Sequence, residues 1–150
     1  MKILALLQLP PPVHGASRMN RLSLDVLKEE YPHTKAINIG LANDASDVNS
    51  LSISKLLKFI KLLGSVWLYS FKVRPDQIYA SISPTGGAFI KDFMFLFVAK
   101  LMKIPIKFHI HGNGISNFYN KKVYRKLYNF LLEGETLIVL SPELKKNILV

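Results

Sequence analysis

Cysteine is absent from the 150-residue sequence. Its absence excludes a disulfide framework and a thiolate metal site, and it fits a reducing cytoplasm. Internal repeats and low-complexity segments are absent as well, while 49% of the residues are hydrophobic. The composition therefore predicts one domain with enough apolar side chains to bury a core.

Long uncharged runs are also missing. The apolar start of the chain ends at Gln8 and three prolines, and no small-residue cleavage site follows, so we expect no signal peptide. The stretch from Ser54 to Lys72 contains three lysines in its first half and Gly64-Ser65 in its middle. A membrane span needs about 20 nearly uncharged residues, so this stretch is not expected to cross a bilayer.

Acidic residues are scarce, because twenty Lys and Arg stand against ten Asp and Glu, for a formal charge of +10. Such a charge favours an anionic partner: nucleic acid, a lipid surface or a phosphorylated substrate. The basic residues are spread among leucines and phenylalanines, with no arginine-rich arm, zinc-finger spacing or aromatic RNA-binding signature. We therefore expect a membrane surface or a phosphate ligand, and no nucleic acid.

Apolar runs alternate with helical patterns along the whole chain. Strands are predicted at Lys2 to Gln8, Thr34 to Ile39, Gln77 to Ile82, the start of Ile104 to Ser116, and Thr136 to Leu140. Helices are predicted at Ser17 to Glu30, Ser54 to Lys72, Ala88 to Met102, Lys121 to Leu132, and from Pro142 after an N-cap at Ser141. This order predicts a single doubly wound, Rossmann-like α/β domain over residues 1–150, with a mostly parallel sheet and helices on both faces.

Two of these helices have informative patterns. The first carries apolar residues at helical spacing, namely Met19, Leu22, Val26 and Leu27. The second has one polar face, traced by Lys55, Lys58, Lys61, Ser65 and Lys72. We expect most of its apolar remainder to pack on the sheet. Candidates for contact with an anionic membrane surface are Lys55, Lys58 and Lys61 of this helix and Arg125 and Lys126 of a later one.

The strand that begins at Ile104 is the predicted site. Its alternation places Lys107, His109 and His111 on one side and Ile106, Phe108 and Ile110 on the other. Gly112 and Gly114 then allow the backbone to turn sharply, so His111 is expected on an exposed loop. Open α/β sheets bind ligands at the carboxyl ends of their strands. The sequence therefore predicts a ligand site at this end.

Two more loops are predicted at the same edge. One runs from Leu9 to Ser17, with three prolines, a glycine at Gly15 and Ser17 as a possible N-cap, and can present backbone N–H groups to a phosphate. The other follows the third strand and contains Gly86 and Gly87. A polar stretch from Gly40 to Ser52 is predicted to be a mobile loop. Neither the dinucleotide fingerprint G-x-G-x-x-G nor the P-loop occurs.

Four short motifs occur in an order that resembles the amino-terminal domain of GT-B glycosyltransferases, in particular glycosyltransferase family four. The motifs are Pro11-Pro12-Val13-His14-Gly15, Arg74-Pro75-Asp76-Gln77-Ile78, His111-Gly112-Asn113-Gly114-Ile115, and Ser141 after Ile138-Val139-Leu140. The likeness runs from Met1 to about Leu149. One departure is Ala16, where the family commonly has a second glycine, and the added methyl group restricts the approach of a phosphate.

The resemblance implies transfer of a sugar, with retention, from a nucleoside diphosphate donor to an acceptor hydroxyl on a lipid-linked or cell-envelope glycan. It implies that His111 is catalytic and points at the transferred sugar. The donor-side residues would be Gly15, Ala16 and Ser141, and the acceptor-side residues His14, Asn113, Gly86 and Gly87. His109 has no role in the resemblance and is expected to be packed and hydrogen-bonded.

The resemblance also implies further partners and a location. A carboxyl-terminal domain with most of the donor site would follow residue 150, so the 150-residue chain alone would be inactive. No metal or other cofactor is expected, because backbone dipoles and cationic side chains can meet the charge of the leaving diphosphate. The expected location is the cytoplasm, peripherally on the inner face of the membrane.

Two other functions stay open. His109 and His111 lie two residues apart on one strand face and could share a metal in a hydrolase, with a third ligand from His14, His33 or Asp92. Alternatively, the chain is a non-catalytic basic module that binds a membrane or another protein through its helices.

Overall fold

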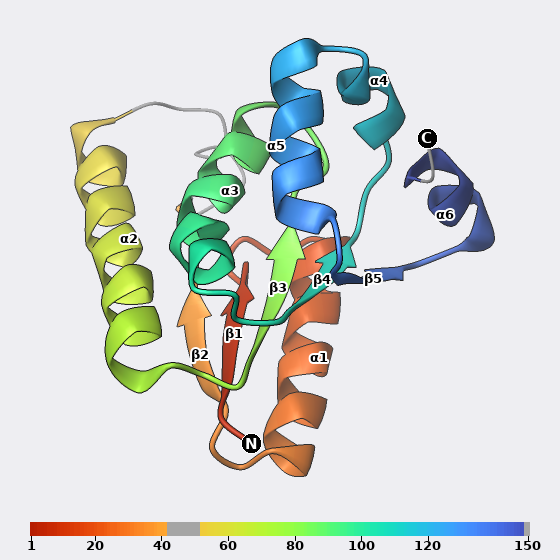
Figure 1. Cartoon of the computed structure of the whole chain (residues 1–150). Coiled ribbons are helices and arrows are strands. Elements are labelled where there is room, and N and C mark those ends of the chain that lie inside the picture. Colours follow the sequence, from red (N-terminus) through yellow and green to blue (C-terminus); the bar gives the residue numbers. More distant parts are fainter. Residues whose placement is uncertain (42–51, 149–150) are drawn as a thin grey trace.

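The computed structural model describes residues 1–41 and 52–148, and most of the loop predicted at Gly40 to Ser52 lies outside them. The described residues form a five-stranded parallel sheet that alternates with helices, so the predicted Rossmann-like α/β fold is confirmed (Figure 1). Everything else in the molecule is arranged around this sheet.

The strands are β1 (Ile3–Leu7), β2 (Lys35–Asn38), β3 (Gln77–Ile82), β4 (Ile106–Ile110) and β5 (Thr136–Val139). The helices are α1 (Gly15–Glu30), α2 (Ile53–Val73), α3 (Gly86–Leu101), α4 (Ile115–Tyr119), α5 (Lys122–Leu132) and α6 (Pro142–Ile148). The short helix α4 was not predicted from the sequence. Gly86 and Gly87, predicted in a loop, are the first residues of α3.

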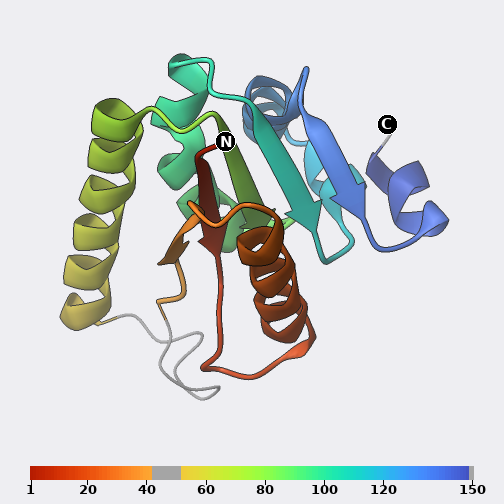
Figure 2. The same ribbon diagram turned by 90° about the horizontal axis from the view of Figure 1, so that it is seen from below.

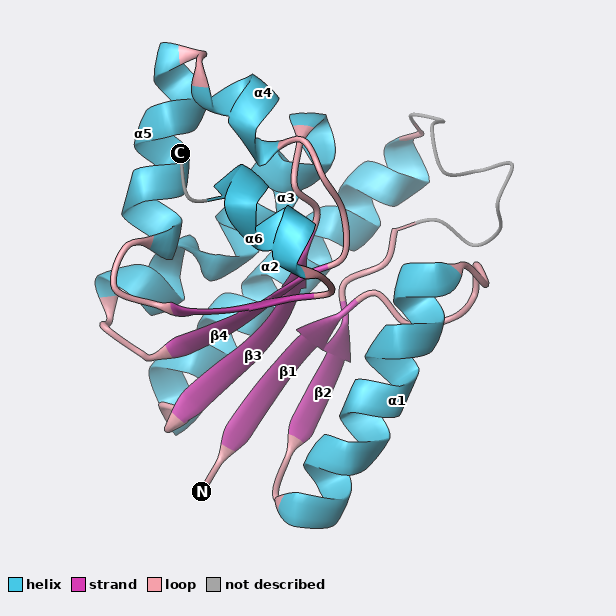
Figure 3. Cartoon of the chain, turned by 90° about the vertical axis from the view of Figure 1, so that its right-hand side faces the viewer, coloured by secondary structure: helices cyan, strands magenta, loops and turns pink. Residues whose placement is uncertain are grey.

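The strand order is β2-β1-β3-β4-β5, and every pair is parallel. Helix α1 covers one face, whereas α2, α3 and α5 cover the other (Figures 1 and 3). The chain therefore leaves β1 toward one face and leaves the neighbouring β3 toward the opposite face. Their exit loops diverge, and this divergence creates the crevice in which sheets of this class bind ligands.

The two faces of the sheet have different character. Ile106, Phe108 and Ile110 of β4 belong to the larger core, under α2, α3 and α5. The smaller core, under α1, contains Tyr79 and Leu24, and the buried His109 faces this side. The alternation predicted for β4 is confirmed. On the face beneath α1, polar side chains such as His109 lie near the carboxyl ends of the strands.

Helix α1 begins two residues earlier than predicted, and its N-cap is His14 instead of Ser17. Ser17 N donates to His14 Nδ1 at 3.2 Å, and His14 N donates to Ser17 Oγ at 2.9 Å. These reciprocal bonds form a capping box, which satisfies two donors at the helix start. The N-cap predicted at Ser141 is confirmed, because its Oγ accepts from Leu144 N at 3.3 Å.

The apolar spacing that predicted helix α1 does not mark its buried face, although Leu27 packs on the smaller core. Met19, Leu22 and Val26 are exposed, while the helix buries Ser17, Asn20 and Leu24. The reason is that Ser17 and Asn20 have polar partners in the capping box and on the sheet, and these partners fix the rotation of the helix. Helical spacing alone does not reveal such partners.

The packing predicted for α2 is confirmed only in part. The helix buries Val66 and Ser70 and packs several half-buried aromatic and leucine side chains on the core. Six large apolar side chains of α2 are exposed: Ile53, Leu56, Leu57, Ile60, Leu68 and Phe71. Helix α2 lies at one end of the helical layer, with α3 beside it, and no other helix of the described chain covers its outer side (Figure 1).

A buried carboxylate anchors the exit of β3. Asp92 of α3 is fully buried, its Oδ2 accepts from Ser83 N at 2.8 Å, and its Oδ1 lies 3.0 Å from Lys91 Nζ. Burial raises the pKa of Asp92, against the opposing effect of Lys91. The bond to Ser83 fixes the turn that connects β3 to α3.

We expect Asp92→Ala to lower the free energy of unfolding by about 1 to 3 kcal/mol, because the Ser83 N–H group would lose its partner. Asp92→Asn is the matched control, since its side-chain oxygen still accepts from that N–H group. Urea unfolding measures both variants. Equal destabilisation of the two would contradict the assigned role of the hydrogen bond.

Candidate functional site

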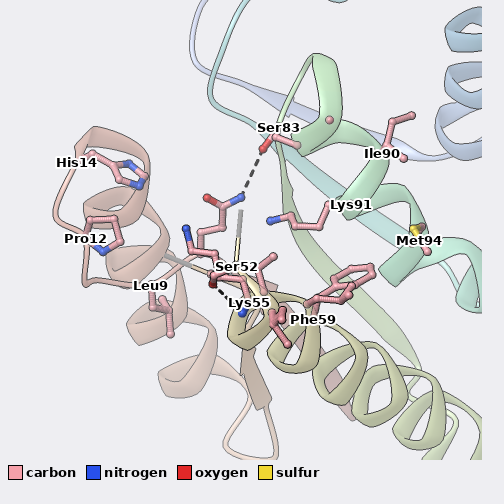
Figure 4. Close-up of a pocket in the computed structure, with 17 residues that line it drawn as sticks. Leu9, Pro12, His14, Ser52, Lys55, Phe59, Ser83, Ile90, Lys91 and Met94 are labelled. Carbon is pink, nitrogen blue, oxygen red and sulfur yellow. Dashed lines mark hydrogen bonds between the residues drawn. The ribbon is translucent and has the colours of Figure 1, made fainter. Parts of the chain in front are cut away.

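Two cavities meet at the carboxyl edge of the sheet, where the exits of β1 and β3 diverge. The smaller has a volume of about 240 Å³ and the larger about 1170 Å³. Gln8 at the end of β1, Ser83 at the end of β3 and the cap residue His14 line both cavities. The three residues form the boundary between the cavities, and Gln8 Nε2 lies 3.4 Å from Ser83 Oγ (Figure 4).

The smaller cavity lies on the α1 side of this boundary. Ala16 and Asn20 of α1 line it together with His111 and Gly112, which follow β4. Parallel pairing puts the ends of β1, β3 and β4 at one edge, so the residues after these strands are brought together. The predicted convergence of the His14 and His111 loops is therefore observed.

Close backbone approach explains the two glycines after β4. A Cβ atom at Gly112 would lie 2.9 Å from Pro84 Cγ, in the loop after β3. Gly114 has a φ of 112°, a value that side chains disfavour. Tyr128 of α5 holds the Pro84 loop by donating to the Pro84 carbonyl at 2.6 Å. These contacts fix the position of His111 relative to β3.

His111 is half-buried, so the prediction of an exposed loop side chain was wrong. Its Nε2 atom lies 2.8 Å from Oδ1 of the fully buried Asn20. Asn20 Nδ2 donates to the Gln8 carbonyl at 3.0 Å, which orients the amide so that its oxygen faces His111. An amide oxygen only accepts, so His111 carries its proton on Nε2 and presents a lone pair on Nδ1.

The electrostatic environment keeps His111 neutral. Burial, with smaller effects of His109 and His14, lowers the pKa of His111 from 6.5 to about 4. Its Nδ1 atom is buried and has no hydrogen-bond partner among the described residues. A neutral imidazole with a free, oriented acceptor can take a hydrogen bond from a hydroxyl group.

His109 is packed and hydrogen-bonded, as expected. Its Nδ1 atom lies 2.7 Å from Tyr79 Oη, and burial lowers the pKa of the imidazole. The rings of His109 and His111 are 4.0 Å apart between centroids. Within residues 1–41 and 52–148, no group of three His, Asp or Glu side chains is placed to hold a metal ion. The metal-hydrolase alternative thus lacks a third ligand in this part of the chain.

Only some of the other predicted site residues line one of the two cavities. Gly87 lines the larger cavity, and Gly15 is the first residue of α1, where an added Cβ would meet nothing within 4 Å. Gly86, Asn113 and Ser141 line neither cavity. Asn113 Oδ1 instead accepts from Gly114 N at 2.7 Å.

The larger cavity lies between α2, α3 and the loop after β1 (Figure 4). Phe59 of α2 and Ile90 and Met94 of α3 give it an apolar wall. Lys55 and Lys91 also line it, and Lys91 is paired with Asp92. The lysines of α2 were predicted to lie on a surface, whereas the structure places Lys55 at this cavity.

The remaining basic residues of the membrane prediction are spread over two helices. Lys58 is half-buried and donates to the Leu41 carbonyl at 3.3 Å, while Lys61 is exposed. Arg125 and Lys126 are exposed on α5, at the other side of α3. None of the helices in the described part of the chain is long and apolar enough to cross a membrane.

Sequence reasoning missed Asn20 and Tyr128, and it named Asp92 only as a possible metal ligand, not as the anchor of the turn after β3. Asn20 had a detectable signal, because positions 17, 20 and 24 lie on one helical face and carry two small polar residues and a leucine. Asp92 is the one acidic residue of the strongly apolar helix α3, which is a comparable signal. No local pattern marks the contact between Tyr128 and Pro84, which are far apart in the sequence.

Comparison with protein-family models, curated proteins and solved structures gives no match for this chain. The likeness to GT-B glycosyltransferases therefore depends on the four sequence motifs alone.

The lowered pKa of His111 predicts how stability depends on pH. Because the folded-state value lies below 6.5, the unfolded chain binds the proton first as the pH falls. The free energy of unfolding should therefore decrease from about pH 6.5 toward pH 4. His109 contributes in the same direction. Urea unfolding at pH 7.5 and pH 5 measures the difference.

Variants assign this pH dependence to His111. In His111→Gln the amide still donates to Asn20 but does not titrate, so the difference between the two pH values should shrink. His33→Gln, at an exposed position, is the matched control. Asn20→Asp should raise the pKa of His111, measured by NMR titration of its ring, because a carboxylate favours the imidazolium. An unchanged ring titration in Asn20→Asp would contradict the contact.

Proposed function

We propose that the chain is the acceptor-side domain of a glycosyltransferase, which moves a sugar from a nucleoside diphosphate donor to a hydroxyl of a lipid-linked acceptor. One observation carries the proposal: at the divergence of β1 and β3, a small cavity lined by several polar residues, among them the neutral, oriented His111, adjoins a large cavity with an apolar wall. An amphiphilic acceptor has two matching parts, a polar sugar and an apolar chain.

The smaller cavity would hold the sugar end of the reaction. On ligand binding, the Nδ1 atom of His111, which is buried in the unliganded chain, would become exposed to the cavity and accept a hydrogen bond from a sugar hydroxyl. The start of α1 at Gly15 and Ala16 would face the diphosphate. In the transfer, the bond from the anomeric carbon to the diphosphate oxygen breaks and a bond to the acceptor oxygen forms. The proton of the acceptor hydroxyl passes to the released nucleoside diphosphate.

The larger cavity would hold the apolar chain of the acceptor. Its volume of about 1170 Å³ exceeds the roughly 300 to 1,000 Å³ typical of small-ligand pockets. Phe59, Ile90 and Met94 would supply apolar contacts, and Lys55 and the Asp92-paired Lys91 line the same cavity, where an anionic linkage would lie. Gly87 lies at the start of α3, next to this wall.

We also propose that donor binding requires a second domain, because the resemblance to GT-B glycosyltransferases implies that most of the donor site lies there. We therefore expect the isolated 150-residue chain to transfer no sugar from a panel of nucleoside diphosphate sugars to alkyl glycosides. Product formation is followed by mass spectrometry. Sustained turnover by the chain alone would contradict the two-domain arrangement.

Acceptor binding tests the proposal directly. We expect decyl glucoside, kept below its micelle concentration, to bind saturably and to shift the ring resonances of His111 in NMR spectra. Gly87→Leu should weaken binding about tenfold or more, because its side chain would enter the cavity. Gly87→Ala is the matched control, since an added Cβ at this position meets nothing within 4 Å.

Two further titrations separate the parts of the ligand. Glucose alone should bind far more weakly, because it lacks the chain. Decyl sulfate, which lacks the sugar, should bind without shifting the His111 ring. Decyl glucoside that binds equally well to the wild type and Gly87→Leu, or that leaves His111 unperturbed, would contradict the proposed acceptor site.

A further inference from the structure

Helix α2 carries an exposed apolar stripe along its whole length. The stripe consists of Ile53, Leu57, Ile60, Leu68 and Phe71, with exposed fractions between 53% and 80%. These positions are three or four residues apart, except around the turn that Gly64 occupies, so the side chains lie on one helical face. Single exposed apolar residues are common on protein surfaces, but a continuous stripe indicates a partner.

The charges of α2 indicate what kind of partner this is. The helix contains four lysines and no acidic residue. Lys61 and Lys72 are exposed, and helical geometry places both on one side of the stripe, about 80° and about 100° around the axis from Ile53 and Phe71. An apolar stripe flanked by lysines matches a helix that lies in the interface of an anionic membrane.

We propose that α2 docks the protein on an anionic bilayer, with the stripe in the boundary between headgroups and acyl chains and the lysines among the anionic headgroups. The proposal differs from a purely electrostatic contact, because the apolar side chains enter the bilayer. It does not depend on the proposed sugar transfer.

The position of α2 permits this arrangement. The helix forms one end of the layer that contains α3 and α5, and no other helix in the described part of the chain covers its outer side (Figures 1 and 2). A flat membrane could therefore reach the stripe along the axis of the helix. Ile53 and Leu56 also line the large cavity, so the cavity opens next to the proposed membrane surface.

A second copy of the chain fits the stripe less well. Pairing two stripes would bring Lys61 and Lys72 near their counterparts, with no acidic residue on α2 to neutralise them. The formal charge of +10 on the whole chain adds to the repulsion. An anionic bilayer is attracted by the same charges.

Helix α1 supplies an internal control. Leu22 and Val26 are exposed to 58% and 59%, much as the stripe residues are. Helix α1 has three basic and three acidic residues, and it lies on the opposite face of the sheet. Apolar exposure is therefore similar on the two helices, while charge and position differ.

The absence of cysteine permits a site-specific test on the whole chain. Single variants Ile60→Cys, Leu68→Cys and, as the control, Leu22→Cys are labelled with the environment-sensitive fluorophore NBD. Vesicles of phosphatidylglycerol and phosphatidylcholine, or of phosphatidylcholine alone, are then added. We expect a blue shift and a severalfold rise in emission for the two α2 labels with the anionic vesicles only, and no change at Leu22→Cys.

Vesicle co-sedimentation of unlabelled variants separates the apolar and the charged contributions. The double variants Leu57→Ser/Ile60→Ser and Lys61→Glu/Lys72→Glu should each weaken binding at least about tenfold. Leu22→Ser/Val26→Ser should leave it unchanged. Gly64→Leu should strengthen binding, because it completes the stripe at a position where an added Cβ meets nothing within 4 Å.

Three results would overturn the proposal. The first is binding that is abolished by Lys61→Glu/Lys72→Glu but unaffected by Leu57→Ser/Ile60→Ser and Gly64→Leu, which would show a purely electrostatic contact. The second is equal NBD shifts on α1 and α2. The third is an NBD shift on α2 that grows with protein concentration in the absence of vesicles, which would show self-association through the stripe.

Discussion

The hydrogen bond between His111 and Asn20 links the two loops that form the candidate site. It joins the residue after β4 to α1, and Asn20 extends the link to the end of β1 through the Gln8 carbonyl. Asn20 is fully buried, so each of its bonds replaces one with water that burial has removed. The rotation of α1, the tautomer of His111 and the shape of the smaller cavity all depend on this contact.

The same link limits the chemistry of His111. Its proton is held on Nε2, and burial disfavours the imidazolium, so the group acts as a hydrogen-bond acceptor near neutral pH. A free imidazole on an exposed loop would be protonated in part and would sample both tautomers. The structural and the proposed catalytic roles of His111 are thus not separable by removing the side chain, and a substitution has to preserve the bond to Asn20.

The fold was largely predictable from the sequence, because strand and helix periods are local properties of the chain. The alternation in β4 and the N-cap at Ser141 follow from residues within a few positions of each other. The rotation of α1 was not predictable, because it is determined by partners on β1 and after β4. The cavity at Lys55 was missed for a similar reason, since α2 and α3 meet there only in the folded chain.

Exposure of the apolar side chains of α2 has a topological cause. The helix connects β2, at one edge of the sheet, to β3, and it packs beside α3 as the last helix of its layer. A helix in the middle of a layer has neighbours on both sides, whereas α3 is the one neighbour of α2 in this layer among the described helices, so an apolar arc wider than its contact with the core stays exposed. Contact of that arc with water costs free energy, and burial of the arc in a bilayer would remove this cost.

Under the two proposals, one end of the protein would face a membrane, the large cavity would open beside it, and the smaller cavity with His111 would lie further inside. A lipid-linked sugar that enters from the bilayer would place its sugar in the smaller cavity, and its apolar chain would stay in the large cavity beside the membrane.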